Sequence, residues 1–127
     1  MTPDALRTAC LELNGAEETF PFGPDTSVFK VGGKIFALSA LDAEPLKVSL
    51  KCDPELAVQL REAYPAITGG WHLNKRHWNT VRIDGSVSDA LLHEMVEDSY
   101  DLVVSRFSRK QQLVLDWPGV TVAQRSH

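Results

Sequence analysis

A short basic segment holds the residues that are best suited to chemistry. Residues 71–82 contain Lys75, Arg76 and Arg82 but no carboxylate, which gives the segment a charge of +3 within a chain of net charge −4. Ammonium and guanidinium groups contact phosphates, and an indole such as that of Trp78 can stack on a base or another planar ligand. The segment therefore predicts a binding surface for an anionic or planar partner.

The strand pattern predicts further cations near this segment. Residues 46–52 alternate apolar with polar side chains, which is typical of a strand that is covered on one face only. In residues 78–83, Trp78, Thr80 and Arg82 alternate with Asn79, Val81 and Ile83, which also predicts a strand. The alternative is an ordinary solvated sheet face, on which Trp78 is half buried against a neighbouring loop. If the two strands share a sheet, the predicted surface carries Lys47, Lys51 and Arg82 on the open face and Lys75 and Arg76 on the adjoining loop.

Two histidines and an asparagine complete the candidate site. His72 and His77 could supply hydrogen bonds to a partner, and the side chain of Asn74 suits the turn by which the chain leaves a strand predicted at residues 71–73. No cysteine pair, helical histidine pair or carboxylate within the segment accompanies the two histidines. We therefore expect no metal site and no cofactor.

The chain lacks the sequence patterns of common catalytic sites. The Gly-x-Ser-x-Gly elbow, the Walker loop and the Gly-x-Gly-x-x-Gly fingerprint are all absent. Cys52 precedes a predicted helix, where a thiolate could be stabilised, but the alternation of its strand places it on the core face. The sequence thus predicts a binding protein and not an enzyme.

The composition is that of one folded domain without a membrane anchor. A chain of 127 residues, 43% of them hydrophobic, is long enough to bury about two-thirds of its surface. The first fifteen residues lack a signal peptide, and no stretch has the roughly 20 apolar residues that span a membrane. These features predict a cytoplasmic protein in which Cys10 and Cys52 are reduced thiols. Because the chain is acidic overall, a nucleic-acid role would need a local basic face.

Helix and strand signals predict the elements that must position these residues. Asp53 and Ser88 stand where a side chain can cap the first turn of a helix, and the helix after Ser88 is expected to continue to about Phe107. A Gly-Gly pair at 32–33 is the connection expected of a tight hairpin. Residues 68–70 are expected to be flexible. Strands are predicted at residues 28–31, 34–39, 46–52, 71–73 and 78–83.

The order of these elements predicts an α+β fold class. Strands and helices do not alternate one by one, and the expected order is α-β-β-β-α-β-β-α. We expect a single two-layer domain over residues 1–115, with an antiparallel sheet and its helices on one face, and a C-terminal tail over residues 116–127. The other face of the sheet would meet water, a partner or a ligand.

Four segments resemble a known family. They read VFKVGGKIFALSAL, SLKCDPELAVQLREAYP, HLNKRHWNTVRIDGS and EDSYDLVVSRF, and they make the chain similar to the MmcQ/YjbR family of small bacterial proteins from the first helix to about Phe107. The resemblance implies a frataxin-like or secretion-chaperone-like domain with the element order given above. The signature positions that it transfers are Lys51, Pro54, His72, Leu73, Asn74, Lys75, His77 and Trp78.

The same resemblance implies a binding function. Family members are described as DNA-binding proteins with two hairpin-like wings, and one comes from an antibiotic-biosynthesis cluster. The alternative is a protein that binds or sequesters a planar small molecule, such as an antibiotic, or a peptide, with Trp71 and Trp78 as walls of its site. Either protein could be a monomer or a homodimer. The residues expected to bind DNA or a ligand are Lys47, Lys51, His72, Asn74, Lys75, Arg76, His77, Trp78 and Arg82.

Overall fold

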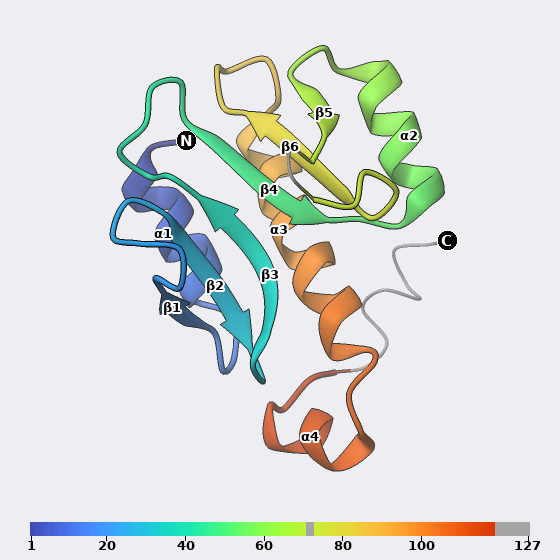
Figure 1. Cartoon of the computed structure of the whole chain (residues 1–127). Coiled ribbons are helices and arrows are strands. Elements are labelled where there is room, and N and C mark those ends of the chain that lie inside the picture. The colour runs from blue at the N-terminus through green and yellow to red at the C-terminus, as the bar shows by residue number, and fades with distance from the viewer. Residues whose placement is uncertain (71–72, 119–127) are drawn as a thin grey trace.

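One antiparallel sheet forms the front layer of the computed structural model, which describes residues 1–70 and 73–118 (Figure 1). In this described part the strand order is β1-β2-β3-β4-β6-β5. None of the described helices is long and apolar enough to cross a membrane. The strands are β1 (Glu17–Thr19), β2 (Ser27–Val31), β3 (Lys34–Ser39), β4 (Lys47–Lys51), β5 (Ile67–Gly69) and β6 (Trp78–Arg82), and the helices are α1 (Pro3–Leu11), α2 (Pro54–Ala63), α3 (Asp89–Val104) and α4 (Arg109–Val114).

Helices α1, α2 and α3 cover one face of this sheet, as the sequence predicts. Helix α3 packs on β3 and β4, α1 packs on α3, and α2 packs on β5 and β6. Figure 1 shows α1 and α3 behind the sheet, so that its other face is turned toward the viewer. The predicted α+β class, with two layers and an antiparallel sheet, is therefore confirmed.

Side-chain caps begin the three long helices, and the caps at Asp53 and Ser88 are the predicted ones. Thr2, Asp53 and Ser88 each accept a hydrogen bond from the backbone N–H three residues later. Each of these bonds satisfies one of the amide groups that have no partner in the first turn of a helix. Proline follows the cap in α1 and α2, where its missing N–H costs nothing.

The core lies between α3 and the covered face of the sheet. Val48 and Leu50 of β4 and Val81 of β6 are each at most 1% exposed, which confirms the alternation read from the sequence. The buried hydroxyl of Ser99 on α3 joins two strands, because it donates to the carbonyl of Phe36 at 2.5 Å and accepts from the amide of Lys51 at 2.8 Å. These bonds fix β4 relative to β3.

The strand before β6 lies earlier than the sequence predicts. Residues 68–70, expected to be flexible, largely form β5 at Ile67–Gly69, and Leu73 follows it in a bend. Trp71 and His72, part of the strand predicted at 71–73, lie outside the described residues. The short strand β1 was not predicted, because its three residues contain two glutamates and no apolar side chain.

The last long helix is shorter than predicted. Helix α3 ends at Val104, and Ser108 begins the separate helix α4 with a capping box that includes Gln111. Between the two helices, Phe107 packs closely on the β2–β3 hairpin. A Cβ at Gly32 would lie only 2.7 Å from the Phe107 ring. Arg109 and Lys110 therefore belong to α4 and not to α3.

The first residues of the predicted C-terminal tail pack on the domain. Trp117 contacts the core, and its indole Nε1 donates to the carboxylate of Asp101 on α3 at 2.9 Å. The remainder of the predicted tail, residues 119–127, lies outside the described residues.

Candidate ligand-binding groove

The pairing of β4 with β6 gathers polar side chains on the open face of the sheet. In this register Lys47 is opposite Arg82, Ser49 is opposite Thr80, and Lys51 is opposite Trp78. The residues that alternate with them on each strand are buried. This arrangement confirms the prediction that the two strands share a sheet and turn these side chains away from the core.

Part of the open face is hollowed into a groove of about 810 Å³. One side is formed by Phe22 from the β1–β2 connection, and the opposite side by β5 together with Leu73 and Lys75. No carboxylate from the described residues lines the groove. The lining comprises the cations of Lys47, Lys75 and Arg82, the hydroxyls of Thr26, Ser39, Ser49, Thr68 and Thr80, and the less polar Phe22, Leu38, Ala40, Pro65, Ala66, Gly69 and Leu73.

Hydroxyl groups form the centre of the groove floor. The Ser49 and Thr80 hydroxyl oxygens lie 2.8 Å apart, and Thr68 of β5 is opposite Thr80 in the sheet. Since one member of the Ser49–Thr80 pair donates to the other, the second member still has its own hydrogen to donate. The floor can thus donate hydrogen bonds to an oxyanion from this pair and from Thr68.

A tight turn holds Lys75 at the wall of the groove. The side-chain oxygen of Asn74 accepts from the amide of Arg76 at 2.9 Å, and the Asn74 carbonyl accepts from the amides of His77 and Trp78. The guanidinium of Arg61 on α2 donates to the Lys75 carbonyl at 3.0 Å. Asn74 therefore makes the turn, as its sequence position predicts, and it does not line the groove.

Two glycines allow this wall to approach the sheet. A Cβ at Gly69 would lie 2.9 Å from the Arg61 guanidinium, and a Cβ at Gly70 would lie 2.8 Å from the Cβ of Trp78. Real Cβ atoms essentially never show separations this short. Gly70 is thus a packing requirement, because the Trp78 Cβ cannot move without its backbone, whereas at Gly69 the Arg61 guanidinium is the movable end of a long side chain.

Arg82 is paired with a carboxylate just outside the basic segment. Its Nε lies 2.8 Å from Oδ2 of Asp84. Hydrogen bonds from Ser86, followed by that from Arg82, hold the pKa of the Asp84 carboxyl well below its usual range. Asp84 consequently stays ionised and offsets part of the Arg82 charge. Lys47 and Lys75 form no ion pair with any described residue.

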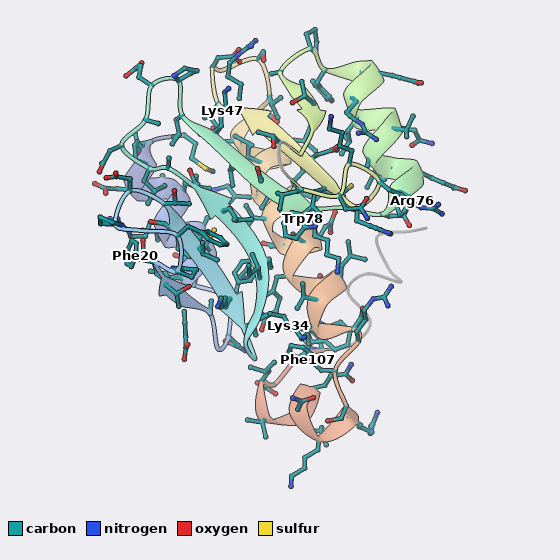
Figure 2. The ribbon with its side chains drawn as sticks, viewed as in Figure 1. Phe20, Lys34, Lys47, Arg76, Trp78 and Phe107 are labelled. Atoms are coloured by element: carbon teal, nitrogen blue, oxygen red, sulfur yellow. The ribbon has the colours of Figure 1, made fainter. Side chains whose placement is uncertain are left out.

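The other predicted site residues that the structure describes lie outside the groove. Figure 2 shows Lys47 and Trp78 toward opposite ends of the β4–β6 pair, with Arg76 beyond Trp78 beside α2. Lys51, Arg76, His77 and Trp78 do not line the groove. Trp78 is therefore not a wall of this groove, since its strand position is at the far end, and its contact with a ligand stays a prediction. His72 and Trp71 lie outside the described residues.

The two cysteines are buried thiols. Burial, followed by the nearby carboxylates of Asp53 and Asp98, raises the pKa of Cys52 to about 11. Burial and then the Glu18 carboxylate raise the pKa of Cys10 to about 12. Both groups are therefore protonated near neutral pH, and the predicted packing role of Cys52 agrees with its 8% exposure.

A sequence model of the YjbR family matches residues 11–102. The chain belongs to the YjbR family. This finding confirms the resemblance seen in the sequence. The matched YjbR segment contains all six strands described above and every residue that lines the groove. Helix α4 and Trp117 lie beyond it.

Relatives in the YjbR family share most of their length with this chain. The chain is 40% identical to the uncharacterized protein YbdF of Escherichia coli O157:H7 over 110 residues, which cover 86% of this chain and 89% of YbdF. It is 33% identical to the uncharacterized protein YjbR of Escherichia coli K12 over 115 residues, which cover 91% of this chain and 98% of YjbR. Neither description states a function.

Solved structures share the YjbR-family fold. A crystal structure of a Deinococcus radiodurans protein with a DUF419 domain is similar at a TM-score of 0.87 and 44% identity, covering 93% of this chain and 90% of that one. A crystal structure of a Pseudomonas syringae protein is similar at a TM-score of 0.66 and 27% identity, and the match covers 78% of this chain and 95% of that one.

Some groove residues of this YjbR-family chain have no clear signal in the sequence. Phe22 lies in a connection between Pro21 and Pro24, where no periodicity predicts its direction. Thr68 belongs to β5, and the sequence next to the Gly-Gly pair gives no strand signal for it. Ser49 and Thr80, by contrast, follow from strand alternation alone.

Proposed function

We propose that this YjbR-family chain is a binding protein for a small anionic molecule, which it holds in the groove without chemical conversion. The observation that carries the proposal is the charge of the lining. Lys47 and Lys75 have no ion-pair partner among the described residues, and no described carboxylate lines the groove beside them. A cytoplasmic location is part of the proposal, and the buried free thiols of Cys10 and Cys52 support it.

The size of the groove supports a small molecule as the ligand. Ligand sites are typically concavities of about 300–1,000 Å³ with a few polar groups placed on an apolar lining. The groove has a volume of about 810 Å³. Because charges are screened within about 8 Å at physiological ionic strength, the lining cations dominate locally although the whole chain has a charge of −4.

Titration with 1-anilinonaphthalene-8-sulfonate tests this proposal. This probe has a sulfonate and an apolar body, and its fluorescence rises when water is excluded from it. We expect the double variant Lys47→Gln/Lys75→Gln to bind the probe at least about tenfold more weakly, which corresponds to about 1.4 kcal/mol. The matched control is Lys34→Gln/Lys110→Gln, which removes the same charge from exposed sites outside the groove.

The control separates local from overall electrostatics. An equal loss of probe affinity in the groove variant and in the control would show that net charge, and not the groove, governs binding. Unchanged affinity in the groove variant would remove the proposal altogether. Circular dichroism of each variant checks that the fold is retained.

DNA binding is the second candidate, and a different observation favours it. Lys51 and Arg76 lie outside the groove but extend the cations toward the far end of the β4–β6 pair (Figure 2). A molecule longer than the groove could contact both groups. Such a contact would agree with the function that the sequence resemblance implies.

Salt dependence and a second double variant distinguish DNA from a small anion. Three phosphate contacts would give a log–log salt slope near −3 for duplex DNA. If DNA is the ligand, Lys51→Gln/Arg76→Gln should weaken the binding of a short duplex while the sulfonate probe binds unchanged. Absence of duplex binding even at low salt would remove DNA as a candidate.

A further inference from the structure

The floor of the groove is divided into an apolar part and a hydroxyl part. The sheet register aligns Leu38 of β3 with Ser49 of β4, Ser49 with Thr80 of β6, and Thr80 with Thr68 of β5. A single row across the strands therefore runs from a leucine to three hydroxyl groups. Neighbouring strands lie about 4.8 Å apart, so the row from Leu38 to Thr68 spans about 14 Å.

The cations lie at the hydroxyl part of this row. Arg82 is two residues from Thr80 on β6, and Lys47 is opposite Arg82. Lys75 lies next to β5, since a Cβ at Gly69 would be 3.1 Å from its Cγ, and it lines the groove together with Thr68. Hydroxyl donors and positive charge thus come together at β4, β6 and β5.

An exposed aromatic side chain marks the apolar part. Phe22 lines the groove and is 68% exposed. It lies in the connection that enters β2, the strand that pairs with β3, and Leu38 and Ala40 line the groove on that side. An aromatic side chain of this kind gains free energy when an apolar surface covers it. The apolar part therefore has an uncovered side chain that a ligand could contact.

We infer that the ligand is amphipathic, with one oxyanion head and an aromatic or aliphatic body. The head, a sulfonate, phosphate or carboxylate, binds over Thr68 and Thr80 beside Lys75. The body lies along the row over Leu38 and packs against Phe22. This inference rests on the proposed function, and it adds the class of the ligand and its direction in the groove.

Three probes separate the two parts of the groove. The first, 1-anilinonaphthalene-8-sulfonate, has both a head and a body, whereas N-phenyl-1-naphthylamine has the body alone. Inorganic sulfate has the head alone, and its binding is measured by displacement of the first probe. We expect the complete probe to bind at least about tenfold more tightly than either part, because it uses both parts of the site.

Substitutions on each part give the decisive comparison. Phe22→Ala should weaken the binding of the complete probe at least about fivefold, while the dissociation constant of sulfate stays unchanged. Thr80→Val should weaken the binding of both the complete probe and sulfate. The matched control is Phe20→Ala, since Phe20 is 49% exposed on the same connection but does not line the groove. This control should leave the affinities for both probes unchanged.

The outcomes distinguish failure of this inference from failure of the proposed function. If Phe22→Ala binds the complete probe as the wild type does, while Lys47→Gln/Lys75→Gln binds it weakly, the division into two parts is wrong and anion binding stands. Equal losses in Phe22→Ala and Phe20→Ala would also overturn the division. If the lysine variant binds as the wild type does, the proposed function itself fails.

Discussion

Two lysines and one arginine line the groove, but their charges are not equally accessible to a ligand. Lys47 and Lys75 have no ion-pair partner among the described residues, whereas Arg82 is 2.8 Å from the ionised Asp84. Counting charges within residues 71–82 overlooks Asp84, because that residue lies two positions beyond the segment. The sequence places the three cations on one surface, and the structure adds the carboxylate that offsets one of them.

Removal of this carboxylate should strengthen anion binding. In Asp84→Asn, Arg82 loses its ionised partner, and we expect affinity for 1-anilinonaphthalene-8-sulfonate to rise about two- to fivefold, the size typical of one exposed charge. Asp4→Asn is the control, because Asp4 is an exposed aspartate that pairs with Arg7 on α1. A gain in both variants would assign the effect to net charge, and no gain in Asp84→Asn would contradict a role for Arg82.

The buried thiol of Cys10 makes the stability of the fold depend on alkaline pH. Burial raises its pKa from the ordinary value of 9.0 to about 12, so above about pH 9 the unfolded chain releases a proton that the native chain keeps. Stability therefore falls as the pH rises from about 9 toward 12, and this group has no effect below that range. Between about pH 8 and 10 the free energy of unfolding should fall by about 1 kcal/mol more for the wild type than for Cys10→Ala. Urea denaturation at each pH measures this difference. Equal losses would contradict the raised pKa.

At the scale of elements, strand alternation predicted the open face of the sheet, and local turn chemistry predicted that Asn74 makes a turn. The alternation is complete in β4 and extends from Thr80 to Arg82 in β6, and it needs no knowledge of the neighbouring strands. The position of β5 could not be predicted in the same way, because it depends on the close approach of Arg61 and Trp78 to Gly69 and Gly70. That approach joins residues eight positions apart in the chain, which the alternation within a single strand does not describe.

The turn at Asn74 should respond to loss of its side-chain acceptor. Asn74→Ala leaves the Arg76 amide without the oxygen that it contacts at 2.9 Å, and we expect a loss of about 1 kcal/mol in the free energy of unfolding. Asn74→Asp keeps an acceptor at this position and should retain most of the stability. Urea denaturation of the three proteins measures the effect, and equal destabilisation of both variants would contradict the turn role.

For the whole molecule, the sequence predicted the fold class and the family, but it did not predict the groove. Local patterns are sufficient for the caps, the Gly-Gly hairpin at 32–33 and most strands. The groove arises because the connection with Phe22 and the loop with Lys75 meet the open face from opposite sides. Nothing in either segment alone indicates the other, so their meeting follows only from the tertiary structure.

The central claim is that the groove on the open face binds a small anionic molecule. Its most direct test is chemical-shift mapping of the ¹⁵N-labelled chain during titration with 1-anilinonaphthalene-8-sulfonate. We predict that the largest amide shifts occur at Leu38, Thr68, Lys75 and Thr80 and disappear in Lys47→Gln/Lys75→Gln. Largest shifts at the exposed Leu113 and Val114 of α4, with the groove amides unchanged, would contradict the claim.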